Sequence, residues 1–387
     1  MLRFLTAGES HGPALTTIVE GLPAGLPLTA EDVGADLSRR QKGFGSGGRM
    51  RIERDGVQFL GGVLAGQTTG APLAMQIENR DWANWRDKEI RPMTIPRPGH
   101  ADLTGAVKYG YRDLRPALER ASARETAARV AAGAVCRRLL AEFGIEVGSY
   151  VVQIGAVAVD LPGDLAYSDR FRQAEENDVR CPDPAAAEEM HAAIRQAMAL
   201  KDTLGGIFEV VALGLPPGLG SHVHWDRRLD GRLMWAVGSI QAVKGVEIGP
   251  AFDNARQRGT QVHDEIFVEA GQLQRRTNRA GGFEGGITTG QPVVVRGAMK
   301  PISTTLTPLR SVDLANGEPA ATRYERSDTC AVPRAAVVGE AMVALILAEA
   351  LLEKLGGDSL AEMQPRFQTL RRAALEDLEM DDEIWQF

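Results

Sequence analysis

Short apolar blocks alternate with polar stretches along the chain, and they predict strands and helices in turn. Apolar runs that alternate or are β-branched predict strands at residues 2–6, 14–19, 57–63, 73–77, 147–159, 207–213 and 292–296, with one more ending at Val246. Apolar positions at helical spacing predict helices at about 31–40, 100–111, 122–143, 184–199, 227–240 and 334–355. Strands mixed with long helices predict an α/β (α+β) protein with layers of helix packed against sheet.

The most apolar stretch, residues 335–352, raises the choice between a membrane span and a buried helix. Gly339, Glu340 and Glu349 interrupt this stretch. A membrane-spanning helix needs about 20 nearly uncharged residues. The stretch therefore predicts a buried helix of a soluble protein with no membrane partner, and Gly356 predicts where that helix ends.

Nothing in the sequence divides the chain into modules. Its 387 residues are enough for two or three average domains or for one large one. We see no linker rich in Ser and Gly, no low-complexity tract, no charge block and no repeat at a fixed period. We therefore expect one interwoven domain over residues 1–387, while a structural repeat without a sequence trace stays open.

Composition and charge limit the classes of partner and the compartment. Hydrophobic residues make up 44% of the chain and charged residues 25%, which is typical of a soluble globular protein. A net charge of −7 argues against a nucleic-acid-binding protein with a uniform basic face, although clustered arginines leave a local anion site open. The three cysteines are too scattered for a disulfide framework or a CxxC metal site, and we see no secretory signal. We expect a cytoplasmic protein.

Two of the six histidines lie in short segments of similar character. His11 lies in Gly-Glu-Ser-His-Gly-Pro at 8–13, and His100 lies in Arg-Pro-Gly-His-Ala-Asp at 97–102. Nearby glycines let a backbone turn sharply and let a ligand approach closely. An imidazole on such a turn is placed to exchange a proton with a bound molecule. His222 and His224 would share a face of a strand, but no third ligand is near in sequence, so we expect no metal site.

Cationic residues surround a glycine-rich loop at residues 39–51, which read Arg-Arg-Gln-Lys-Gly-Phe-Gly-Ser-Gly-Gly-Arg-Met-Arg. Backbone N–H groups in such a loop, together with guanidinium groups, bind phosphate or carboxylate. The loop formally matches the pattern G-x-G-x-x-G, but it follows a predicted helix rather than a strand, so it gives little support to a dinucleotide fold. A solvated loop without a ligand is the competing interpretation.

Three further segments combine anion-binding chemistry with an ordinary alternative. Residues 120–126 place two arginines and a serine at the start of a predicted helix, where N–H groups favour a phosphate; surface arginines are the alternative. The glycines of 281–286 and the hydroxyls after Lys300 suit a planar ligand and a second phosphate, or turns. Asp328 lies among arginines, either as a structural ion-pair partner, which is the default, or as a base.

Taken together, these segments resemble the chorismate synthase family over nearly the whole chain. Each segment alone is modest, but their order and spread make the resemblance specific. The matching segments are residues 8–12, 39–50, 97–102, 120–126, 241–247, 281–286, 300–301 and 326–330. The resemblance implies conversion of 5-enolpyruvylshikimate-3-phosphate to chorismate and phosphate, a 1,4-anti elimination that needs reduced FMN without net redox change. It also implies a homotetramer and a β-α-β sandwich with pseudo-symmetric halves, in which helices pack between or against antiparallel sheets.

The resemblance further implies roles for individual residues. Positions that bind the substrate are matched by Arg40, Arg49, Arg97, Arg124 and Arg326. Positions that hold FMN are matched by Arg120, Ala121, Ser122, Gln241, Ala242, Gly285, Lys300, Pro301, Ile302, Ser303, Thr304 and Arg326. His11 resembles the histidine that protonates the departing phosphate, His100 the one that interacts with reduced flavin, and Asp328 the carboxylate that works with flavin N5 to remove the C6 proton. Ser10 and Ser122 would support these groups.

One position departs from the family. Ser46 stands where family members often carry an arginine assigned to substrate or NADPH contact. We therefore expect dependence on externally reduced flavin, with NADPH only as a reductant. Two other functions stay open, namely a flavin oxidoreductase with net hydride transfer and a non-catalytic binder of RNA or polyanions through residues 39–51. The net acidity and the 5% aromatic content count against the second.

Overall fold

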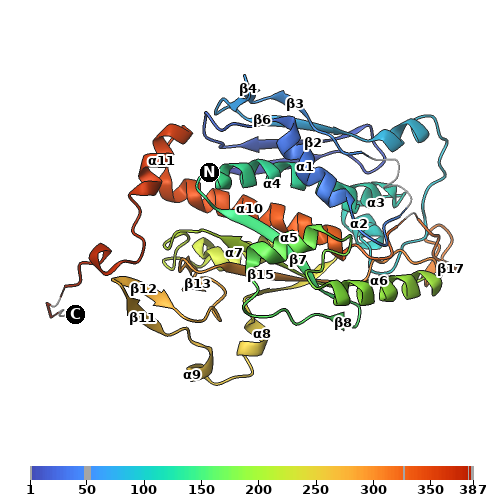
Figure 1. The fold of residues 1–387 in the computed structure, drawn as a ribbon. Coiled ribbons are helices and arrows are strands. Elements are labelled where there is room, and N and C mark those ends of the chain that lie inside the picture. The colour runs from blue at the N-terminus through green and yellow to red at the C-terminus, as the bar shows by residue number, and fades with distance from the viewer. Residues whose placement is uncertain (1, 48–53, 326, 382, 385–387) are drawn as a thin grey trace.

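Two antiparallel sheets enclose a layer of helices in the computed structural model, which describes residues 2–47, 54–325, 327–381 and 383–384 (Figure 1). The first sheet has the order β1(Arg3–Ala7), β2(Ala14–Glu20), β6(Leu73–Glu78) and β3(Gln58–Gly61). The second has the order β10(Val243–Ile248), β15(Val293–Met299), β9(Gly206–Leu213), β7(Glu146–Ile154) and β8(Val157–Ala158). The predicted fold class is confirmed.

Four helices form the layer between the sheets, namely α1(Ala30–Gln41), α4(Thr126–Ala141), α7(Leu229–Gly238) and α10(Val332–Leu355). Helix α4 packs on the first sheet, α10 packs on the second, and the two helices pack on each other. Where they cross, a Cβ atom on Gly133 would collide with Ala341, so the close approach requires glycine. Among the described residues, α10 alone is long and apolar enough to cross a membrane, but 89% of its most apolar window is buried inside the protein. It is a core helix, as predicted.

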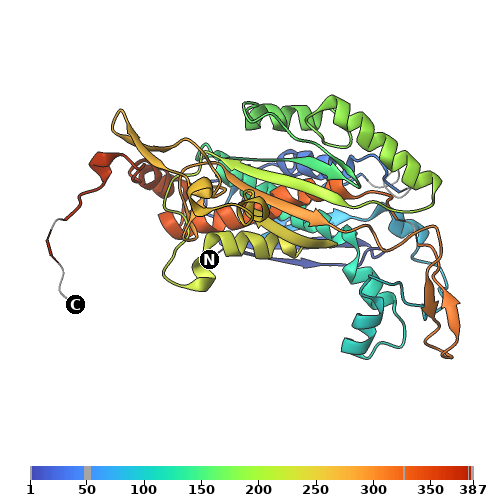
Figure 2. The same ribbon diagram turned by 90° about the horizontal axis from the view of Figure 1, so that it is seen from below.

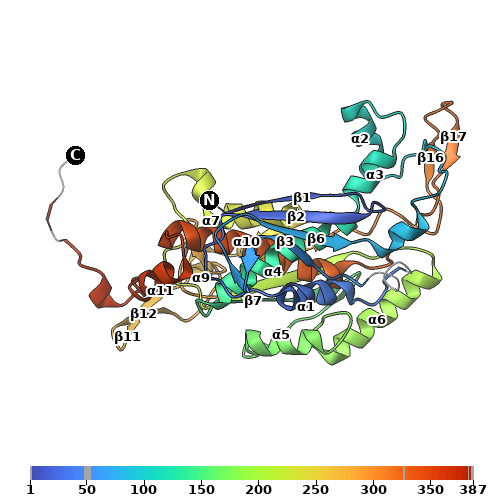
Figure 3. The same cartoon turned by 90° about the horizontal axis from the view of Figure 1, so that it is seen from above.

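The other elements cover the edges and outer faces. Helix α5(Tyr167–Glu175) packs on the face of the second sheet opposite α10, and α6(Pro184–Ala199) lies beside β8 (Figure 2). Helices α2(Asp102–Tyr109) and α3(Arg115–Ala121) extend from one end near the hairpin of β16(Arg310–Val312) and β17(Pro319–Ala321) (Figure 3). The remaining elements are β4(Val63–Leu64), β5(Gln67–Thr68), η2(Arg80–Asn84), η3(Ala123–Glu125), η4(Trp225–Arg227), α8(Ala251–Asn254), α9(Gly259–Val262), β11(Ile266–Glu269), β12(Gln272–Arg275), β13(Phe283–Glu284), β14(Ile287–Thr288), α11(Leu360–Gln368) and η5(Leu375–Asp377).

Two predicted elements differ from the structure in informative ways. The helix predicted at 122–143 opens with the 3₁₀ turn η3 because the Ser122 side chain accepts the N–H of Arg124, and α3 is a separate helix that we did not predict. The strand predicted at 147–159 breaks into β7 and β8 because Gly155 has a left-handed φ of 57° and reverses the chain.

The two halves of the fold repeat one arrangement. The order β1-β2-β6-β3 of the first sheet recurs as β7-β9-β15-β10 in the second. In each half, a helix follows the second strand of that order: α1 follows β2, and α7 follows β9. A long central helix follows the third strand: α4 comes after β6, and α10 comes after β15. This agrees with the expected pseudo-symmetric halves and explains why no linker divides the chain.

The structural repeat, which the sequence left open, has kept a short sequence trace. Residues 21–28 read Gly-Leu-Pro-Ala-Gly-Leu-Pro-Leu, and 214–221 read Gly-Leu-Pro-Pro-Gly-Leu-Gly-Ser. In the first half, Thr68 Oγ1 donates to the Pro23 carbonyl at 2.6 Å and accepts the Leu26 N–H at 3.0 Å. In the second, Thr288 makes the same two bonds to Pro216 and Leu219, both at 2.8 Å. The spacing between the paired segments varies, so a search at fixed period does not find them.

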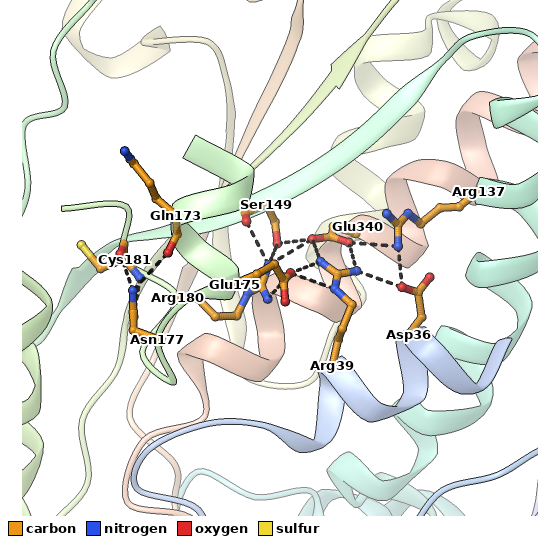
Figure 4. Close-up of polar contacts among 10 residues, drawn as sticks. All are labelled: Asp36, Arg39, Arg137, Ser149, Gln173, Glu175, Asn177, Arg180, Cys181 and Glu340. Carbon is orange, nitrogen blue, oxygen red and sulfur yellow. Dashed lines mark hydrogen bonds and ion pairs between the residues drawn. The ribbon is translucent and has the colours of Figure 1, made fainter. Parts of the chain in front are cut away.

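A buried ion-pair cluster ties α1 to α10 and to β7 (Figure 4). Glu340 of α10 is 1% exposed, and its carboxylate accepts bonds from both Nη atoms of Arg39 at 2.6 and 2.7 Å and from Ser149 Oγ at 2.6 Å. Arg137 and Arg180 approach the same carboxylate at 3.5 and 3.3 Å. Burial by itself would raise the pKa of Glu340, but the surrounding arginines lower it to about 2. The cluster therefore holds a charged carboxylate in the core and fixes the end of α1.

Candidate active site

Most of the predicted site segments meet at one cavity of about 210 Å³. It lies where α4 and α10 begin, because residues just before α4 and in the first turn of α10 both line it. The N–H groups at the beginning of a helix favour an anion. The residues that line the cavity are Ser10, His11, Arg40, Gly47, Trp85, Arg97, His100, Leu118, Ser122, Ala123, Arg124, Ile302, Ser303, Thr304, Glu325, Ser327, Asp328 and Arg334.

His11 is held on the turn between β1 and β2. Gly8 has a φ of 108°, and a Cβ atom there would collide with the Ala14 carbonyl, so the turn requires glycine. The ring Nδ1–H donates to Glu119 Oε1 at 2.9 Å, and the backbone N–H of His11 donates to Glu119 Oε2 at 2.7 Å. The Trp85 ring lies 4.2 Å from the imidazole, centroid to centroid. Burial would raise the pKa of the Glu119 carboxyl, but its bonds with His11 hold that pKa below its usual value.

His100 has a carboxylate partner of the same kind. Its Nδ1–H donates to Asp102 Oδ1 at 2.5 Å. The Nε and Nη2 donors of Arg97 bind both oxygens of Asp102, at 2.8 and 3.0 Å, and its Nη1 donates to Thr304 at 3.1 Å. Burial would raise the pKa of Asp102, but His100 and Arg97 hold it well below its usual range. The local sequence at 97–102 therefore builds a complete unit of arginine, carboxylate and imidazole.

Arg40 and Arg124 share one buried carboxylate. Arg124 Nη1 binds Asp55 Oδ1 at 2.6 Å, and Arg40 Nη1 lies 3.4 Å from Oδ2. Arg40 also donates to Thr126 Oγ1 and to the Ala123 carbonyl, both at 2.9 Å. Burial lowers the pKa of Arg40 to about 10, although Asp55 acts in the opposite direction, so its guanidinium remains charged at neutral pH. Two arginines against one carboxylate leave net positive charge at the cavity.

Asp328 and Arg334 form an ion pair at the beginning of α10. Arg334 Nη1 binds Asp328 Oδ2 at 2.6 Å, and the Gly47 N–H donates to Oδ1 at 2.8 Å. Within the described part of the chain, Arg334 Nε and Nη2 are buried and have no hydrogen-bond partner. The same two atoms of Arg97, Nε and Nη2, bind the carboxylate of Asp102. The edge of Arg334 thus matches an oxyanion that the described residues do not provide.

The residues predicted to hold a cofactor form an edge beside the cavity. Ser122, Ile302, Ser303 and Thr304 line it directly, and Pro301 and Ala121 adjoin them in sequence. Lys300 Nζ donates to the Gly99 carbonyl at 2.9 Å, and the Lys300 N–H donates to the Ala242 carbonyl at 3.0 Å.

The same edge continues through Glu125. Gln241 Nε2 and the Thr6 hydroxyl donate to its carboxylate at 2.9 and 2.7 Å, and Arg120 Nη2 donates to Thr6 Oγ1 at 2.7 Å. Gln241 Oε1 is buried and has no hydrogen-bond partner among the described residues. A buried oxygen without a partner among the described residues, on an edge that also carries the exposed Arg120 side chain, suits a polar ligand.

Some predicted residues are not brought together. Gly285 lies in the turn between β13 and β14, where His222 is its nearest neighbour, and it does not line the cavity of this chain. Arg49 and Arg326 lie outside the described residues. Arg39, from the predicted anion loop, binds Glu340 in the ion-pair cluster instead.

Sequence reasoning missed three residues that shape the cavity, namely Asp55, Trp85 and Glu119. Arg334 is one of the arginines expected around Asp328, and the structure pairs the two. Glu119 and Asp55 reach their partners across 108 and 69 residues of sequence, so no local pattern marks them. The segment of His222 and His224 forms bends rather than the strand we assumed, and the described residues contain no group of three or more potential metal ligands.

Comparison with known proteins gives one consistent result. The family model for chorismate synthase matches residues 2–352. Chorismate synthase of Chlorobaculum tepidum is 55% identical over 391 residues, covering 96% of this chain and 98% of the relative. That of Rubrobacter xylanophilus is 57% identical over 377 residues, covering 95% and 96%. A crystal structure of chorismate synthase has a TM-score of 0.78 and 47% identity, covering 95% of this chain and 96% of that one. The matched range includes every segment that lines the cavity.

Proposed function

The chain belongs to the chorismate synthase family of lyases, and we propose that it converts 5-enolpyruvylshikimate-3-phosphate to chorismate and phosphate with reduced FMN and no net redox change. In this elimination C6 loses a proton, the bond between C3 and the phosphate oxygen breaks, and the ring gains one double bond. The substrate loses only a proton and phosphate, so the overall reaction needs no oxidant.

This proposal rests on one observation: acid–base groups and cations line the same cavity. His11 and His100 both face it, each with a carboxylate on Nδ1. The substrate carries one phosphate and two carboxylates, and guanidinium groups bind both kinds of anion. The arginines that support binding are Arg40, Arg97 and Arg124, with Arg334 in addition. Arg49 and Arg326 remain part of the proposal from the sequence resemblance.

The polar edge supports a place for FMN. Among the described residues Gln241 Oε1 has no hydrogen-bond partner, and the same edge carries the cations of Arg120 and Lys300. We propose that FMN is held by residues 120–122, 241–242 and 300–304, together with Gly285 and Arg326. Reduced FMN, when bound, would supply transient electron density to the substrate.

The residues of the chain would manage the protons. His11 would donate a proton to the departing phosphate, and Ser10 and Ser122, whose hydroxyls lie 3.1 Å apart, would support it. His100 would hold a proton on the flavin side of the cavity. Asp328 would accept the C6 proton. Its Oδ2 atom would then give up the hydrogen bond from Arg334 and bind that proton instead.

The setting of the enzyme is also part of the proposal. We propose a cytoplasmic homotetramer that acts on a small molecule and has no nucleic-acid or membrane partner. Ser46 supports the use of externally reduced flavin, because its short side chain removes the cation that would contact NADPH.

An anaerobic phosphate-release assay tests this function. Phosphate should appear with reduced FMN and should not appear with oxidised FMN in the absence of a reductant. Full turnover with oxidised FMN alone would contradict the mechanism. Consumption of one NAD(P)H per product would support a flavin oxidoreductase, and salt-sensitive binding of RNA without flavin binding would support a polyanion binder.

A further inference from the structure

The carboxylate of Glu119 makes contacts with His11 that the sequence motifs did not indicate. Glu119 is the fifth residue of α3, whereas His11 lies on the turn between β1 and β2. The Glu119 oxygens lie 2.9 and 3.1 Å from His11 Nδ1, and one of them also accepts the His11 backbone N–H at 2.7 Å. Both side chains are largely buried, with 18% exposed for His11 and 11% for Glu119.

We propose that Glu119 is the positioning residue of His11, which orients the imidazole and fixes the nitrogen that carries the proton of the neutral ring. This inference rests on the proposed function, in which His11 delivers a proton to the departing phosphate. Because a carboxylate only accepts hydrogen bonds, the contact assigns the proton of neutral His11 to Nδ1. Nε2 is then the nitrogen that gains a proton when the ring becomes cationic, and it lies on the side of the ring away from Glu119.

The end of α3 is fixed to the turn by more than this side chain. The Glu119 carbonyl accepts the Ser10 N–H at 3.3 Å, so backbone and side chain of one residue hold two consecutive residues of the turn. Trp85 packs against the imidazole at 4.2 Å between ring centroids. These contacts restrict both translation and rotation of the His11 ring.

The second histidine of the cavity offers an internal comparison. His100 donates through Nδ1 to Asp102, just as His11 donates to Glu119. The His100 pair is separated by two residues in sequence and the His11 pair by 108, so only the fold brings the latter together. Burial separates these two pairs from the His224–Asp226 pair, because the Glu119 and Asp102 side chains are 11% and 0% exposed and that of Asp226 is 57% exposed.

The charge around the cavity explains why His11 needs a carboxylate. The cations that face it are Arg40, Arg97, Arg124 and Arg334, with His100 as a further ionisable group, and the other acids are Glu325 and Asp328. Nearby cations disfavour a positive charge on an imidazole, whereas an adjacent carboxylate favours it. Glu119 is the acid in direct contact with His11 among the described residues.

The test compares kcat and KM across pH for the wild type and Glu119→Gln. The amide keeps an oxygen for the backbone N–H and removes the charge. We expect kcat at pH 7.5 to fall about 10- to 100-fold and KM to change less than about threefold, because the variant alters the orientation of a proton-transfer group and not the binding of substrate. Asp226→Asn is the matched control, because Asp226 pairs with exposed His224 at 2.6 Å outside the cavity. A wild-type profile in Glu119→Gln would overturn the proposal.

A double-variant comparison separates positioning from an independent role. If Glu119 acts through His11, then His11→Ala and His11→Ala/Glu119→Gln should turn over at the same rate. The proposal would be contradicted if the double variant were slower than His11→Ala by the same factor that separates Glu119→Gln from the wild type. Glu119 would then affect turnover independently of His11.

A measurement without turnover keeps this proposal apart from the proposed function. The ring signals of His11 in NMR, identified by their absence in His11→Ala, should show the Nδ1–H tautomer at high pH in the wild type. The share of the Nδ1–H tautomer should fall in Glu119→Gln. An Nε2–H tautomer in the wild type would overturn the proposal even if Glu119→Gln does not fold, whether or not the protein releases phosphate.

Discussion

Arg39 and Arg40 are consecutive residues near the end of α1, yet their guanidinium groups serve two separate sites. Arg39 binds Glu340 in the buried ion-pair cluster, whereas Arg40 bonds to Thr126 and faces Asp55 at the cavity. Consecutive residues of a helix lie about 100° apart around its axis, which allows this division. The ion pair of Arg39 therefore anchors the helix that presents Arg40.

The cluster around Glu340 should make stability depend on acid pH. The folded protein lowers the pKa of Glu340 from 4.5 to about 2, so the stabilisation is complete above pH 4.5 and is lost as pH falls toward 2. This pKa shift of Glu340 contributes on the order of 3 kcal/mol to the free energy of unfolding at neutral pH. Urea unfolding of wild type and Glu340→Gln should therefore differ most near pH 7, and the difference should shrink as the pH falls from 4.5 toward 2. A difference that stays the same across this range would contradict this.

Both cavity histidines should be required for turnover. We expect His11→Ala and His100→Ala each to lower the rate of phosphate release at least about 10-fold, because each removes a proton-transfer group. His224→Ala is the control, since His224 is exposed and lies outside the cavity. A wild-type rate in either cavity variant would remove the role proposed for that histidine.

The unpartnered edge of Arg334 should contribute to substrate binding. Arg334→Lys keeps the charge but loses the Nε and Nη2 pair that matches an oxyanion. We expect KM to rise about tenfold, equivalent to about 1.4 kcal/mol of binding free energy. Arg232→Lys is the control, because Arg232 binds Glu349 and Glu353 away from the cavity. Equal KM values for the two variants would show that water, rather than ligand, satisfies the Arg334 edge.

The turn that carries His11 should not tolerate a side chain at Gly8. Gly8 and Gly25 both have left-handed φ values, of 108° and 85°, but only at Gly8 would a Cβ atom meet other atoms within 4 Å. Both alanine variants should lose about 1 kcal/mol of stability from backbone strain. Gly8→Ala should lose more and should also turn over slowly. Thermal unfolding and turnover, measured on both variants, check this, and equal effects would contradict the role of the collision.

Contacts within a single short segment of the cavity were largely predictable. At 97–102, Arg97, His100 and Asp102 lie within six residues, so local backbone geometry is enough to bring them together. Core helices such as α10 were predictable because their apolar pattern is continuous over many turns. Helix α3 was not predicted, because its seven residues are too few to show helical spacing.

The sequence by itself determined the strands of the two main sheets, the long helices and the family. These follow from propensity, apolar spacing and motif order, which are properties of neighbouring residues. Only the tertiary structure decided which charges meet. Glu119 with His11, Asp55 between Arg40 and Arg124, and Arg39 with Glu340 are pairs formed across 15 to 301 residues. Such pairs depend on where the pseudo-symmetric halves place α1, α3, α4 and α10, and no local pattern encodes the partner of a charged side chain.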